Sequence, residues 1–114
     1  MDIDTNDIKK NKMKLLIVTA VEEFQKDVLK LFKKAGIEAF STSEIDGYKN
    51  GNNSVVATQS WFPGEKGGSE SLMVFSFAQE EKIETFFKLV EDYNNTLETN
   101  NPVRVVVVPI ERAI

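Results

Sequence analysis

The fold of this chain is decided by LLIVTAVEEF (residues 15–24) and by its counterpart MVFSFAQEEK (residues 73–82). Each stretch starts with an apolar run of strand length and passes through a pair of glutamates into a segment with helical spacing. A shift of 58 positions aligns Ala20, Glu22 and Glu23 with Ala78, Glu80 and Glu81, and Lys30 and Leu31 with Lys88 and Leu89. The sequence therefore predicts two similar halves, each with a strand followed by a helix.

In the first half, the apolar run at residues 14–20 predicts a strand that is covered on both faces. Residues 21–35 predict a helix, because their apolar side chains recur at steps of three and four, and Gly36 follows where a helix C-cap belongs. Residues 37–46 roughly alternate, which predicts a second strand with Ile37, Ala39 and Ile45 as its inward candidates.

The second half repeats this pattern. Residues 71–78 predict a strand, residues 80–94 predict a helix that ends before Pro102, and VRVVVV at residues 103–108 predicts the last strand. The order β-α-β, loop, β-α-β predicts an α+β fold, the ferredoxin-like βαββαβ sandwich, in which both helices cover one face of an antiparallel sheet. We expect residues 13–114 to form this single domain and the polar residues 1–12 to form a flexible tail.

One consequence concerns the other face of the sheet. The strands at residues 14–20, 71–78 and 103–108 carry apolar residues at both parities, although the helices cover only one face. Exposing the second face would leave an apolar patch larger than the roughly 300–600 Å² that is usual on monomers. The sequence therefore predicts that this face is buried against other copies of the chain.

Composition excludes several classes of function. The chain has no cysteine and no histidine, so thiol chemistry is excluded and a metal would have only oxygen ligands and methionine. The net charge of −4 argues against nucleic acid as a partner. No apolar run reaches the length of a membrane span, and the polar N-terminus is not typical of a signal peptide, so a cytoplasmic protein is expected.

The stretch between the two halves, EIDGYKNGNNSVVATQSWFPGEKGGSES (residues 44–71), is the candidate functional segment. It holds five of the six glycines and the only tryptophan. Connections longer than about a dozen residues in compact domains are usually functional or disordered. Its middle, SVVATQSWF, has strand character and suggests the arm of an extended hairpin.

Three stretches resemble the PII signalling superfamily, whose small ferredoxin-like subunits form trimers. MKLLIVTAVEEFQKDVLKLFKKAGIEAFS (residues 13–41) is similar to the family's opening strand and helix, and STSEIDGYKNG (residues 41–51) is similar to its second strand at the base of the long T-loop. VVVPIERAI (residues 106–114) is similar to the family's last strand and its exit. The resemblance implies a divergent, non-enzymatic, cytoplasmic homotrimer, which would bind an effector such as ATP, ADP or AMP between subunits and regulate a transporter or an enzyme through the T-loop.

The chain also departs from the family. The family's loop before the last strand is glycine-rich and basic and grips phosphates, whereas this chain has LETNNP at residues 97–102. Nitrogen-regulating members carry a tyrosine in the T-loop for covalent modification, whereas residues 49–69 contain none. The resemblance therefore implies no uridylylation here.

The candidate site residues follow from this resemblance and from the loop itself. Gly47, Tyr48 and Lys49 are the candidates for the ligand site at the loop's base; the alternative is a turn glycine, a packed aromatic ring and a solvated lysine. Trp61, Phe62 and Lys66 are the candidates for partner binding, and the aromatic pair either docks into a partner or folds back on the sheet edge. We predict no catalytic residue and no metal ligand. The glutamate pairs 22/23 and 80/81 are interpreted as first-turn residues whose negative charge interacts favourably with the helix dipole.

Two functions of other classes stay open from the sequence. One is a divalent-cation tolerance protein similar to the CutA family or to efflux-associated PII-like proteins, although the lack of histidine and cysteine weakens a role for copper. The other is a structural trimeric module that captures a partner through Trp61.

Overall fold

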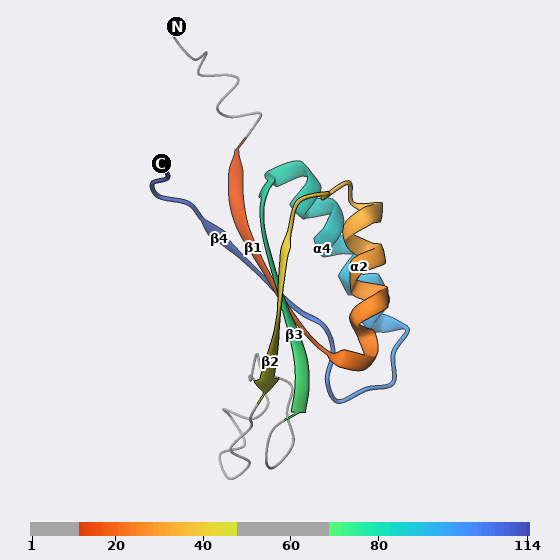
Figure 1. Ribbon diagram of the computed structural model, residues 1–114. Coiled ribbons are helices and arrows are strands. Elements are labelled where there is room, and N and C mark those ends of the chain that lie inside the picture. The colour runs from red at the N-terminus through yellow and green to blue at the C-terminus, as the bar shows by residue number, and fades with distance from the viewer. Residues whose placement is uncertain (1–11, 48–68) are drawn as a thin grey trace, which may run out of the picture.

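The computed structural model describes residues 12–47 and 69–114 of the chain (Figure 1). The elements follow one another in the predicted order, with one short 3-10 helix, η1, before the first α-helix. They are β1 (Met13–Val21), η1 (Glu22–Phe24), α2 (Gln25–Lys34), β2 (Ser41–Gly47), β3 (Ser69–Gln79), α4 (Glu80–Asn95) and β4 (Arg104–Pro109).

The four strands form one antiparallel sheet in the order β2-β3-β1-β4. β1 lies in the middle, where Val18 pairs with Val74 on β3 and with Val105 on β4. Both helices lie on the same side of this sheet (Figure 1). The predicted ferredoxin-like βαββαβ sandwich is therefore confirmed, with β2 and β4 at its two edges.

The hydrophobic core lies between the helices and one face of the sheet. At its centre the ring of Phe32 on α2 lies 4.4 Å from the ring of Phe86 on α4, and both side chains are fully buried. The sheet and the helices supply the other buried side chains, among them Leu16, Val18, Ala20, Leu72, Val74, Val28, Ile83 and Val90. Apolar residues of one strand parity and of one side of each helix therefore make the core, as the period predicts.

A polar contact joins the two helices at one end. Tyr93 Oη on α4 donates a hydrogen bond of 2.7 Å to Asp27 Oδ2 on α2, and its ring meets Phe24 edge-on at 6.2 Å. Burial, the bond to Asp27 and the charge of that carboxylate raise the pKa of Tyr93 to about 12. The hydroxyl therefore stays protonated and continues to donate throughout the physiological pH range.

Two element starts differ from the prediction by four residues, whereas the other boundaries lie within two residues. The expected helix over residues 21–35 starts as the 3-10 turn η1 and becomes α-helical at Gln25. The second strand begins at Ser41 rather than at Ile37, and Ala39, predicted to point inward, is exposed. The carbonyl of Ala39 accepts a 2.6 Å hydrogen bond from the Ser76 hydroxyl. At Ala39 this side-chain bond replaces the backbone hydrogen bond that a paired strand would make.

Gly36 ends α2 as predicted. Its φ is +76°, and the backbone N–H of Ile37 donates to the carbonyl of Phe32 at 3.0 Å, which closes the last turn. A Cβ at this position would meet only Lys82 Cε, at 3.8 Å. The glycine is therefore required by the backbone conformation and not by a lack of space.

We predict that Gly36→Ala lowers the free energy of unfolding by about 1–2 kcal/mol, because alanine disfavours the left-handed conformation. Gly36→Asn is the matched control and should lose clearly less, since asparagine tolerates this region. Chemical denaturation of both variants measures the difference. Equal losses for the two variants would contradict the conformational explanation.

Candidate functional site

The root of the long loop is the last residue pair of β2 and β3. Gly47 ends β2 and is buried, and it pairs with Ser69, the first residue of β3. Of the predicted site residues, Gly47 alone lies in the described part of the chain. The other five, Tyr48, Lys49, Trp61, Phe62 and Lys66, lie outside the described residues, as does the predicted hairpin arm SVVATQSWF. Their roles stay predictions.

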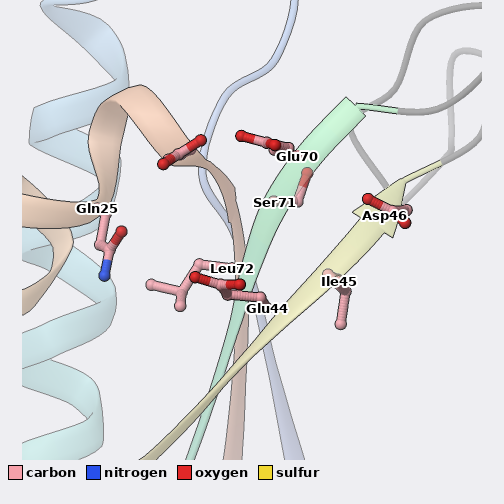
Figure 2. Close-up of a pocket in the computed structure, with 8 residues that line it drawn as sticks. Gln25, Glu44, Ile45, Asp46, Glu70, Ser71 and Leu72 are labelled. Carbon is pink, nitrogen blue, oxygen red and sulfur yellow. The ribbon is translucent and has the colours of Figure 1, made fainter.

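An open cleft of about 400 Å³ lies next to this root, on the side of the sheet that the helices cover. β2, β3, η1 and the start of α2 enclose it, and Figure 2 shows its side chains. Carboxylates dominate the lining, which consists of Glu22, Gln25, Glu44, Ile45, Asp46, Glu70, Ser71 and Leu72.

The strand register explains why the carboxylates converge. Glu44 pairs with Leu72 and Asp46 pairs with Glu70, so both β2 carboxylates have the parity of the core-facing Leu72. Beyond the end of the core, this parity carries acidic instead of apolar side chains. Glu22 joins them from η1 (Figure 2 draws all eight lining residues).

The pKa of one of these carboxyl groups is perturbed by its acidic neighbours. The pKa of Glu22 is raised above its ordinary value of 4.5. The largest cause is a hydrogen bond to Glu70; smaller causes are the negative charge of Glu70, burial and the charge of Glu44. Like charges held this close favour the protonated form of one partner. An anionic ligand would meet the same repulsion, so the helix side of the root is unsuited to a phosphate.

The opposite face of the sheet, here called the outer face, has a different chemistry. Phe77 is 56% exposed, and none of the apolar residues that make up most of this face is fully buried; they include Met13, Leu15, Ile17, Ile45, Met73, Phe75, Phe77, Val106 and Val108. Among the described strand positions that point to the outer face, Arg104 is the one charged residue. Arg104 pairs with Thr19 and is partly exposed.

The position of Arg104 is fixed from α4. Asn94 Nδ2 donates to the carbonyl of Val103, and the N–H of Val103 donates to Asn94 Oδ1, both at 2.9 Å. This two-bond clamp ties the end of α4 to the residue before Arg104. Val103 is buried in the core, so the backbone at the start of β4 is held on both sides.

Gly47 and Arg104 do not come together within one chain. Gly47 lies on β2 and Arg104 on β4, the two opposite edges of the sheet. The two edges are three strand spacings apart, about 14 Å across the sheet. Gly47 is level with Ser69 of β3 and Arg104 is level with Met73, so four residue steps add about 13 Å along the strands. A ligand site that uses both residues requires two copies of the chain.

The sequence interpretation missed Arg104 and the carboxylate cleft. It weighed LETNNP as the loss of a basic loop and did not consider the arginine two positions farther on. A signal was available, because alternation within VRVVVV places Arg104 and Val106 on one face. The carboxylate convergence required the register of β2 against β3, which the sequence does not specify.

Two further properties concern the described residues alone. No three Asp, Glu, His or Cys side chains of residues 12–47 and 69–114 lie in a group that could hold a metal ion. In the same ranges, neither α2 nor α4 is long and apolar enough to cross a membrane.

Solved structures with the same fold include proteins from three bacteria. CPII, a nitrogen regulatory PII-like protein from Thiomonas intermedia K12 determined with ADP, AMP and bicarbonate, aligns with a TM-score of 0.57 and 14% identity over 90% of this chain and 96% of that chain. A putative PII-like signaling protein from Thermus thermophilus aligns with a TM-score of 0.56 and 16% identity over 83% of each chain.

This chain has the fold of the PII-like signalling proteins. A DUF3240 family protein from Shewanella baltica OS155 shares the fold, with a TM-score of 0.61 and 14% identity over 90% of this chain and 93% of that chain. No protein-family model and no curated protein sequence matches the chain. At these identities the likeness establishes the PII-like fold, and the predicted resemblance is confirmed at that level.

The carboxyl pair generates a pH prediction. The folded protein holds the Glu22 proton more tightly than the unfolded chain, so the stabilisation is complete below pH 4.5 and is lost as the pH rises through the raised pKa. Glu70→Gln keeps a hydrogen-bonding partner without the charge, and we expect its stability to fall less over this range. Urea denaturation at a series of pH values measures the effect.

The control for this experiment is Glu91→Gln, which removes an exposed carboxylate from α4, far from the cleft in the sequence. It should leave the slope of stability against pH above 4.5 unchanged. A slope that Glu70→Gln does not alter would show that Glu70 does not raise the pKa of Glu22 in solution. The pH dependence of stability that Glu80 contributes has the opposite sign. Its hydrogen bond to Lys14 and the charge of Lys14 lower the pKa of Glu80, so this stabilisation is lost on acidification.

Proposed function

We propose that the chain is a PII-like regulatory subunit, which assembles as a cytoplasmic homotrimer through the outer face and binds an anionic effector between subunits. The observation that carries the proposal is the composition of the outer face. It is apolar over its centre and holds one cation, Arg104, near an edge. The protein is not an enzyme in this proposal, and its output is the contact of its loop with a partner.

Apolar area supports the assembly. The helices cover the core face alone, and the outer face keeps a Phe75–Phe77 edge-to-face pair, 6.3 Å between ring centroids, next to the aliphatic residues of β1 and β4. Burial of apolar surface stabilises by about 25 cal/mol per Å². Contact of these faces between copies removes them from water, whereas a monomer leaves them exposed.

The effector class follows from the charge of Arg104. A guanidinium at the rim of a buried apolar interface is costly unless an anion pairs with it, and its fork of N–H donors suits a carboxylate or a phosphate. The ligands bound to CPII are ADP, AMP and bicarbonate, all of them anionic or phosphate-bearing. An adenine nucleotide or a smaller anion is therefore our proposed effector here.

Two copies are needed for this site. β4 of one copy, with Arg104, has to approach β2 of the next copy, with Gly47, because these strands are opposite edges of the sheet. We assign Tyr48 and Lys49 to the same site and Trp61, Phe62 and Lys66 to the contact with a transporter or an enzyme. Effector binding would order the loop, so that the ligand's preference for the ordered state sets the response.

The assembly is tested by a charge placed in the outer face. Ile17 and Phe75 are cross-strand partners on that face, and we predict that Ile17→Asp or Phe75→Asp yields monomers at micromolar concentration, because carboxylates cannot be buried unpaired. Sedimentation velocity measures the mass. Leu29→Asp on α2, a half-buried aliphatic position on the helix side, is the matched control and should keep the wild-type mass.

The effector is tested by thermal shift. An effector at a hundred times its dissociation constant should stabilise the protein by about 2.7 kcal/mol, which raises the melting temperature by roughly 10 °C. We predict such a rise with at least one of ATP, ADP and AMP, and its loss in Arg104→Gln. Arg112→Gln, at an exposed position, is the control.

Two results of the thermal-shift experiment would contradict the proposed effector site. If none of ATP, ADP, AMP, cyclic nucleotides and bicarbonate changes the melting temperature, the proposed effector class is wrong. If a nucleotide binds equally well to Arg104→Gln, the site lies elsewhere. Neither result bears on the assembly, which the sedimentation experiment tests separately.

A further inference from the structure

The outer surface of α2 carries a lysine stripe, defined here as Lys26, Lys30, Lys33 and Lys34. All four side chains are exposed. Steps of three and four residues place them on one side of the helix, opposite the buried Val28, Leu31 and Phe32. A ten-residue helix thus presents four of the chain's 14 basic residues in one direction.

Helix stability accounts for only part of this stripe, since Asp27, the one carboxylate within α2, has a favourable spacing of three residues to Lys30 alone. Lys26–Lys30 and Lys30–Lys34 are like-charge pairs at a spacing of four, which destabilise an isolated helix. Lys33 and Lys34 favour the dipole in the last turn, but Lys26 lies in the first turn, where a positive charge opposes it. Among the described residues, Lys14 and Glu80 form an ion pair, and none of the stripe's lysines forms one with a described partner.

The neighbouring helix has the opposite charge. α4 lies beside α2 on the same side of the sheet (Figure 1), joined to it by the Phe32–Phe86 and Tyr93–Asp27 contacts. Its exposed charged positions include two lysines and four carboxylates, which are Glu81, Glu84, Glu91 and Asp92. The helix layer is therefore divided into a basic side on α2 and an acidic side on α4, in a chain whose net charge is −4.

We propose that the lysine stripe of α2 is a docking surface for an acidic segment of a partner protein. This contact is separate from the outer face of the sheet, since α2 lies on the other side of the sheet and the stripe points away from the core. It gives the protein a second interaction surface, which does not depend on the proposed effector. Charge complementarity supplies its selectivity and a faster association.

The dimensions of the stripe define the partner. Lys26 and Lys34 are eight residue steps apart, which is about 12 Å along the helix axis at 1.5 Å per residue. Three or four carboxylates over that length match the stripe, either along a short extended segment or on one side of two helical turns. Exposed ion pairs are individually weak, so we expect modest affinity that falls steeply with salt.

A protein segment fits this surface better than a membrane or a nucleic acid. A flat anionic bilayer that reaches the lysine stripe would also approach the carboxylates of α4 in the same layer, and so would a nucleic acid duplex, which is wider than one helix. The carboxylates of α4 repel both. A narrow acidic segment can follow α2 alone, which makes it the occupant that the charge pattern favours.

The test measures binding of a fluorescein-labelled oligoglutamate peptide to the full-length protein by fluorescence anisotropy, with oligoglutamine as the neutral probe. We expect saturable binding of oligoglutamate at about 20 mM salt and a loss of at least tenfold at about 200 mM, because the contact is electrostatic. Lys30→Glu/Lys34→Glu should abolish it. Lys12→Glu/Lys88→Glu has the same change of formal charge at exposed positions outside the stripe and should keep most of it.

The neutral variant Lys30→Gln/Lys34→Gln avoids acidic residues in the last turn of α2 and guards against a folding defect, which circular dichroism checks. It should weaken binding at least tenfold while folded. Equal losses in the stripe variant and the control would overturn the proposal, because net charge would then explain the binding. Binding to phosphatidylglycerol vesicles or to duplex DNA, with none to oligoglutamate, would also overturn it.

Discussion

The structure depends on one imbalance: its sheet is apolar on both faces, and its helices cover only one of them. The core face is satisfied within the chain by α2 and α4, around the Phe32–Phe86 contact. The outer face keeps Phe75, Phe77 and the aliphatic residues of β1 and β4 in contact with solvent. The proposed assembly follows from this imbalance, because other copies can cover what the helices cannot.

Charge then divides the molecule into regions of different sign. The outer face has a single cation among its described residues, at the opposite edge of the sheet from Gly47, so an anion site that uses both requires two copies. The helix side of the loop root gathers carboxylates, which raise the pKa of Glu22 and whose negative charge would repel an anionic ligand. The outer surface of α2 is basic beside an acidic α4. In our proposals, the sign of the charge of each region selects its ligand before any finer recognition.

The sequence predicted the architecture well, because apolar periodicity, Gly36 and the repeat of LLIVTAVEEF as MVFSFAQEEK all act locally. It predicted the site less well. Ala39 was expected to point inward within a strand, but its carbonyl accepts a hydrogen bond from the Ser76 hydroxyl and β2 starts only at Ser41. The carboxylate cleft depends on the register of Glu44 and Asp46 against β3, a long-range property that no local pattern contains. Arg104 could have been assigned to the outer face from strand alternation alone.

The central claim is that the outer face is buried between copies. Multi-angle light scattering on the unmodified protein at micromolar concentration tests it most directly, since it measures mass without assuming shape. We expect the mass of a trimer, three times the 12.9 kDa of one chain. A mass of 12.9 kDa at that concentration would contradict it, because the apolar outer face would then be stable in water.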